Sequence, residues 1–177
     1  SVRIEQTVAG NVDIVGPSYF SSAIEPVFNN WSETGRRLRY MGEAIINSLM
    51  AESSTFIMAL GHNDQGSADT DEDYYAEFVQ RIDWLIQYAN QYNVKVVVPD
   101  FCWTAPDDRR TRGQLRRLAT ETRGVYVNLP RMIFSGGVPA STSYLIDTLK
   151  MWTDGSHPNE GGHKWIAETV ARAMGLS

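Results

Sequence analysis

Two side chains of complementary chemistry, Asp154 and His157, stand three residues apart near the end of the chain. They lie in a segment rich in glycine and proline, a composition that favours a sharply turning loop over a helix face. A carboxylate that accepts the Nδ1–H of an imidazole fixes its tautomer and leaves Nε2 free as a base. The pair therefore offers two of the three groups of a nucleophilic triad. The rest of the chain would have to supply a nucleophile and donors for an oxyanion.

A second polar segment, residues 61–64 (Gly-His-Asn-Asp), directly follows an apolar run. After a buried strand, the Asn63 side chain can direct its NH2 group toward the ligand edge of a sheet. Glycine at the first position lets the backbone approach closely. Each motif alone is common turn chemistry. The two motifs together, in this order, form a strong signal for a reactive site.

The elements that would position these motifs follow from the apolar pattern. It predicts strands at residues 12–15, 55–60, 94–98 and 125–129, and helices at residues 36–51, 74–92, 109–122 and 160–173. The strands at 55–60 and 94–98 are nearly all apolar, as expected of strands buried on both faces. Residues 130–153 read as a long loop. We predict one α/β domain over residues 1–177, a three-layer α/β/α sandwich with a mainly parallel sheet. Ligands bind beyond the carboxyl ends of such strands.

Composition limits the classes of partner. The formal net charge of −5 argues against nucleic acid, whose phosphates would be repelled. No run approaches the roughly 20 apolar residues that span a bilayer, and no signal peptide is visible. Cys102 is the only cysteine, which excludes an internal disulfide and leaves the redox compartment open.

The chain opens on Ser1 rather than Met, so processing and excision from a longer protein both stay open. The localisation is not determined, and secretion or a place in a larger extracellular protein is compatible with the sequence. The oligomeric state also stays open.

These motifs resemble those of the SGNH hydrolases, also called the GDSL esterase/lipase family, whose fold is flavodoxin-like. Residues 61–64 look like the third block of the family. Residues 154–159 (Asp-Gly-Ser-His-Pro-Asn) with Gly161 look like the fifth. The first block, Gly-Asp-Ser after the first strand, is matched in part by residues 16–18 (Gly-Pro-Ser), and Gly35 is the best match to the second. The resemblance spans roughly residues 12–170.

Carried over residue by residue, the resemblance implies that Ser18 is the nucleophile, His157 the base and Asp154 its orienter. The oxyanion would be held by the backbone N–H groups of Ser18 and Gly35 and by the Asn63 side chain. No cofactor and no metal is implied. Pro17 replaces the usual Asp of the first block, which in the family is not the triad acid, so the chemistry can survive the change.

The sequence therefore predicts a serine esterase that removes a short acyl group, acetyl being expected, from a carbohydrate or another small ester. Trp103 follows a strand and Trp152 lies beside the triad loop. Aromatic faces at these places suit sugar rings, although packing is the default role of a tryptophan. His62 occupies the variable position of its block, where a structural or substrate-edge role is expected.

Other classes of protein stay open. A non-catalytic carbohydrate-binding or assembly module could keep the fold without the nucleophile. Pro17, which departs from the first block of the family, is the feature that favours this alternative. A lipase or thioesterase of the same family is a further alternative. Asp154, His157 and His163 could be metal ligands, but no fourth ligand with recognisable spacing appears. A group of arginines is interpreted as the solvent-exposed face of a helix, with its charge offset by nearby acids. The alternative is that these arginines bind an anionic polymer as substrate. The group consists of Arg109, Arg110, Arg112, Arg116 and Arg117.

Overall fold

The computed structural model describes residues 35–101, 109–137, 140–154 and 156–176. The chain divides into two compact units, residues 1–36 and 37–177, and the fold below is that of the second unit. The expected strand at residues 12–15, the expected nucleophile Ser18 and the expected sugar-stacking residue Trp103 lie outside the described residues.

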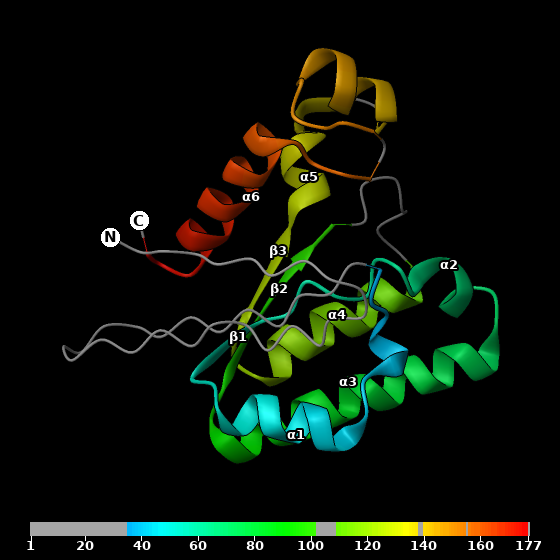
Figure 1. The fold of residues 1–177 in the computed structure, drawn as a ribbon, viewed down its shortest axis with the longest axis vertical. Helices are drawn as coiled ribbons and strands as arrows, with labels where there is room; N and C mark the ends of the chain where they lie inside the picture. The colour runs from blue at the N-terminus through cyan, green and yellow to red at the C-terminus, as the bar shows by residue number, and fades with distance from the viewer. Residues whose placement is uncertain (1–34, 102–108, 138–139, 155, 177) are drawn as a thin grey trace, which may run out of the picture. The chain divides into compact units, whose positions relative to one another are not determined.

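Among the described residues, three parallel strands form a sheet in the order β1-β2-β3 (Figure 1). They are β1 (Thr55–Ile57), β2 (Lys95–Asp100) and β3 (Val125–Asn128). Helices separate them along the chain, as the long crossover connection between parallel strands requires. The prediction of an α/β fold with a parallel sheet is confirmed for the described residues, and three of the expected strands are found near their expected positions.

The side chains of β2 alternate between two apolar cores. Val96 and Val98 belong to a core with α1 (Glu43–Ala51), α3 (Glu72–Tyr92) and α4 (Arg110–Glu121), whereas Val97 belongs to a core with α6 (Glu160–Ala173). Successive strand side chains point to opposite faces, so β2 is buried on both sides. Figure 1 shows α1, α3 and α4 together on one side of the strands and α6 on the other.

The first strand departs from the expectation. β1 ends at Ile57, whose side chain is 46% exposed, so the prediction that residues 55–60 are buried on both faces is wrong. Within the described part of the chain, β1 pairs with a neighbour along one edge only, the edge shared with β2. Burial of an apolar strand depends on what covers it, which the strand's own sequence does not encode.

Two other segments differ from the sequence prediction for local reasons. The helix expected at residues 36–51 is divided into a 3₁₀ helix, Leu38–Tyr40, and α1, because Gly42 between them is extended. The loop expected at residues 130–153 contains most of α5 (Leu129–Ile133), a 3₁₀ turn at Ser135–Gly137 and a π-helix at Tyr144–Thr148. Buried apolar side chains from this segment join the α6 core, and that packing orders a stretch whose composition favours a loop.

Candidate functional site

The loop that carries Asp154 and His157 is closed by backbone pairing at its base. An isolated antiparallel bridge joins Trp152 to Pro158. The Asn159 N–H donates to the Met151 carbonyl at 2.9 Å, and the Asn159 side-chain amide donates to the Lys150 carbonyl at 2.9 Å. The two ends of the loop are therefore held side by side, which fixes the short segment between them.

Helix α6 begins directly after this loop, with the bounds that the sequence predicted. Its cap is Asn159, whose Oδ1 accepts from the Gly162 N–H at 3.1 Å. A Cβ at Gly162 would lie 2.1 Å from the Met151 carbonyl oxygen and 2.8 Å from the Pro158 Cβ. Only glycine allows the first turn of the helix to approach the base of the loop this closely.

Asp154 and His157 are in direct contact, as the sequence predicted. The imidazole Nδ1 lies 2.8 Å from Asp154 Oδ2 and 3.0 Å from Oδ1. The backbone N–H groups of Ser156 and His157 also donate to Oδ1, at 2.7 and 2.8 Å. The bond from the His157 side chain, followed by these two backbone bonds, lowers the pKa of Asp154 to about 2.

This geometry assigns the tautomer of the histidine. An ionised carboxylate only accepts hydrogen bonds, so Nδ1 carries the proton and Nε2 of the neutral ring has a lone pair. The His157 side chain is 77% exposed, and no hydrogen bond to Nε2 is found within the described ranges. Nε2 is thus open to accept a proton from a group that approaches it.

The Gly-His-Asn-Asp segment forms a tight turn beyond the end of β1. The Asp64 N–H donates to the Gly61 carbonyl at 3.2 Å. Gly61 has φ 102°, in the left-handed region, and a Cβ there would lie 3.3 Å from a methyl group of Leu115. Glycine therefore suits this turn for both conformation and space. His62 and Asn63 are exposed on the turn, whereas Asp64 is buried.

The turn and the loop lie near one another. The pKa of His62 is lowered, chiefly because the surrounding protein disfavours its charged form, with a smaller contribution from His157 and an opposing one from Asp100. His157 can act on His62 only if the two rings are within electrostatic range. Two motifs more than 90 residues apart in the chain are therefore within electrostatic range of each other.

Two other expected site residues, Gly35 and Trp152, lie among the described residues. Gly35 is exposed with φ 71°, a left-handed conformation that favours glycine, and it belongs to the first unit. Trp152 is 3% exposed and packs in the α6 core with Val97 and Val127. Its packing, together with its bridge to Pro158, anchors the loop and leaves little of the ring surface for a sugar.

The sequence analysis missed a buried polar cluster at the end of β2. The Arg112 Nε donates to Asp100 Oδ2 at 2.6 Å, and the two side chains are 1% and 0% exposed. The Tyr126 hydroxyl also donates to Asp100 Oδ2, and burial, followed by this bond, raises the pKa of the phenol. Arg112 is therefore a core residue, and its assignment to a solvated helix face is wrong. The sequence holds no signal for a pair that forms only when α4 packs on β2.

Neighbouring arginines are paired with acids on the surface. Arg109 contacts Asp69 at 3.0 Å, and Arg110 contacts Glu72 at 2.7 Å. Arg117 contacts Asp83 and, at 2.9 Å, Glu121. These pairs neutralise the group locally, which agrees with a solvated face offset by acids for these three arginines.

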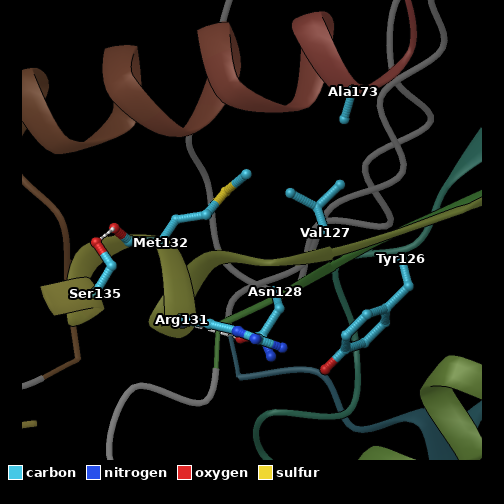
Figure 2. Close-up of a pocket in the computed structure, with 7 residues that line it drawn as sticks. All are labelled: Tyr126, Val127, Asn128, Arg131, Met132, Ser135 and Ala173. Atoms are coloured by element: carbon cyan, nitrogen blue, oxygen red, sulfur yellow. Dashed lines mark hydrogen bonds between the residues drawn. The ribbon is translucent and has the colours of Figure 1, made fainter. Parts of the chain in front are cut away.

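A shallow depression of about 530 Å³ lies elsewhere, among β3, α5 and α6. Figure 2 shows its lining: Tyr126, Val127, Asn128, Arg131, Met132, Ser135 and Ala173. Its one lining serine, Ser135, donates to the Met132 carbonyl at 3.2 Å, and no carboxylate or imidazole is among the lining residues that the structure describes. The depression lacks a base for nucleophilic chemistry. The candidate site is therefore the edge formed by the turn and the loop.

The described residues offer neither a group of metal ligands nor a membrane-spanning helix. No group of three or more histidine, cysteine and acidic side chains in that part of the chain could hold a metal ion, and His163 is exposed on α6. None of the helices formed by the described residues is long and apolar enough to cross a membrane. Comparison of the chain with protein-family models, with curated proteins and with solved structures finds no match.

Proposed function

We propose that the protein is a serine esterase of the SGNH type, which hydrolyses short acyl esters through Ser18, His157 and Asp154. One observation carries the proposal: the Asp154 carboxylate holds Nδ1–H of His157, and none of the described residues bonds to Nε2 of this exposed side chain. This is the arrangement that a general base for a serine hydroxyl requires. We also propose that the complete fold is a three-layer α/β/α sandwich with the flavodoxin-like strand arrangement of the family.

In the proposed reaction, Nε2 of His157 takes the proton of the Ser18 hydroxyl as its oxygen attacks the ester carbonyl. The negative charge that develops on the carbonyl oxygen is stabilised by the Asn63 side chain and by the backbone N–H groups of Ser18 and Gly35. The imidazolium then protonates the leaving alcohol. Water, deprotonated by the same nitrogen, then attacks the acyl-enzyme. The bond between the acyl carbon and the Ser18 oxygen breaks, the acid leaves, and the imidazolium returns its proton to Ser18. The proximity of His62 to His157 supports a site in which Asn63, on the same turn, faces the reacting ester.

The substrate class that we propose is an acetylated carbohydrate. It is supported by the family resemblance and by the position of Trp103 after a strand. Trp152 does not support it, because the ring is buried.

Steady-state hydrolysis tests both parts of the proposal. p-Nitrophenyl esters of rising acyl length should show the highest kcat/KM at acetate, and Ser18→Ala should abolish the activity without changing the far-UV circular dichroism. Acetylated sugars should then exceed p-nitrophenyl acetate in kcat/KM. Activity that survives Ser18→Ala would refute the triad. A preference for long acyl chains would favour a lipase or thioesterase. A protein that binds sugars without hydrolysing any ester would be the non-catalytic module.

A further inference from the structure

Asp64, the last residue of the Gly-His-Asn-Asp turn, is fully buried and has no part in the proposed reaction. Its carboxylate accepts hydrogen bonds from two other segments. The Leu38 N–H donates to Oδ2 at 2.8 Å and the Arg39 N–H donates to Oδ1 at 3.3 Å. The Tyr74 hydroxyl donates to Oδ1 at 3.1 Å. One side chain thus joins the turn that carries Asn63 to the 3₁₀ helix and to α3.

The partners of Asp64 are groups that need an acceptor. Leu38 and Arg39 are the first residues of the 3₁₀ helix Leu38–Tyr40, and the first N–H groups of a helix have no partner within it. A carboxylate there satisfies two of them and is favoured by their partial positive charge. Because the site is buried, removing the carboxylate would leave these donors without water to replace it.

Tyr74 is itself held in place from two sides. Arg37 Nη1 donates to the Tyr74 hydroxyl at 3.4 Å. The Arg39 guanidinium lies over the Tyr74 ring, 4.1 Å from its centre, and forms an ion pair with Glu77 at 2.8 Å. The acceptor and its donors therefore belong to one connected network, which resists displacement of the turn.

We propose that Asp64 is a positioning residue for the oxyanion hole. It clamps the turn that presents Asn63 to the 3₁₀ helix Leu38–Tyr40 and to α3. The inference rests on the proposed function, in which the Asn63 side chain supplies an oxyanion donor. Asp64 does not touch the substrate. It acts on the reaction by fixing the turn on which Asn63 stands.

A clamp that positions donors has a kinetic signature that simple stabilisation lacks. Donors of an oxyanion hole interact more strongly with the tetrahedral intermediate than with the planar ester, so their displacement lowers kcat and leaves KM nearly unchanged. A misplacement of about 1 Å can cost on the order of 100-fold in rate. A residue that only stabilises the fold would lower the melting temperature and leave both constants of the folded enzyme unchanged.

The experiment compares Asp64→Asn with Tyr74→Phe and with Leu85→Ala, using p-nitrophenyl acetate at a temperature where all are folded. Asparagine has one oxygen where aspartate has two. Its NH2 group would therefore face one of the two backbone N–H donors, and that hydrogen bond would be lost. Tyr74→Phe removes one bond to the carboxylate and keeps both backbone bonds. Leu85→Ala leaves a cavity in α3 about three turns from Tyr74, and it serves as the control for lost stability.

We expect kcat to fall about 10- to 100-fold in Asp64→Asn, with KM within about twofold. Tyr74→Phe should show a smaller fall in kcat, and Leu85→Ala should keep kcat while its melting temperature drops. An unchanged kcat in Asp64→Asn, or a change in KM alone, would overturn the inference about Asp64. The proposed function would still stand if the wild type showed Ser18-dependent hydrolysis. If Asp64→Asn does not fold, an unchanged kcat in Tyr74→Phe overturns it. A wild type without Ser18-dependent hydrolysis refutes the proposed function and this inference together.

Discussion

Replacing Gly162 with alanine should displace the loop that holds the proposed base. The added Cβ would lie 2.1 Å from the Met151 carbonyl oxygen and 2.8 Å from the Pro158 Cβ, and both neighbours are backbone or ring atoms that cannot swing away. The helix start and the base of the loop must separate. Their separation weakens the Trp152–Pro158 bridge and the bond from the Asn159 N–H to Met151.

Gly161 is the matched control for this substitution. A Cβ there meets only the Asn159 Oδ1, at 3.3 Å, and both glycines lie in the first turn of α6. Alanine favours a helix over glycine by up to about 1 kcal/mol at either position, so this gain cancels between the two variants. The difference between them then reports the overpacking, which typically costs about 1–3 kcal/mol.

Urea unfolding should therefore show Gly162→Ala to be less stable than Gly161→Ala by about 1–3 kcal/mol. In a chain of this length, each kcal/mol lowers the melting temperature by about 2–4 °C. The kcat for p-nitrophenyl acetate should fall on the order of 100-fold in Gly162→Ala, because His157 moves with the loop. Equal stability and equal kcat in the two variants would refute the claim that this close approach fixes the site.

Three further predictions concern Arg112, His62 and Asn63. Arg112→Met removes one partner of the buried pair with Asp100, which typically costs about 3–5 kcal/mol; a urea midpoint that hardly moves would contradict the pairing. Folding lowers the pKa of His62, so the unfolded chain binds a proton at this residue before the folded chain does as the pH falls. The free energy of unfolding should therefore decrease as the pH falls below the ordinary histidine pKa, near 6.5. His62→Gln should reduce the fall in melting temperature between pH 7.5 and pH 5, and an unaltered fall would count against this linkage. Asn63→Ala should lower kcat about 10²–10³-fold with little change in KM; a rise in KM alone would assign Asn63 to ground-state binding.

The segments that the sequence predicted well carry their own boundary signals. Helix α6 combines an apolar period with an asparagine cap and glycines in its first turn, and its predicted and observed bounds agree. The contact between Asp154 and His157 is local, so the spacing of three residues was sufficient to predict it. The short helix α5, in a stretch predicted as a loop, also has such a signal: Asn128 caps it and accepts from the Arg131 N–H at 3.0 Å.

The features that sequence could not predict depend on packing between distant segments. Asp100 and Arg112 pair only because α4 packs on β2, and neither residue's neighbours in the chain encode the contact. The bonds of Asp64 reach Leu38 across 26 residues, so the motif reveals the turn but not what the turn is tied to. The same holds for the exposed Ile57, whose apolar character indicated a strand without indicating what covers it.

The most direct test of the proposed triad is the mass of the protein after reaction with a fluorophosphonate, because only an activated serine reacts readily with this reagent. We expect one label per chain on the peptide that contains Ser18. The label should be absent in Ser18→Ala and strongly slowed in His157→Ala, and Asp154→Ala should also slow it because the ring loses its orienting partner. A wild-type protein that takes up no label, or one labelled at Ser21, Ser22 or Ser32 instead, would contradict the assignment of Ser18 as the nucleophile served by His157.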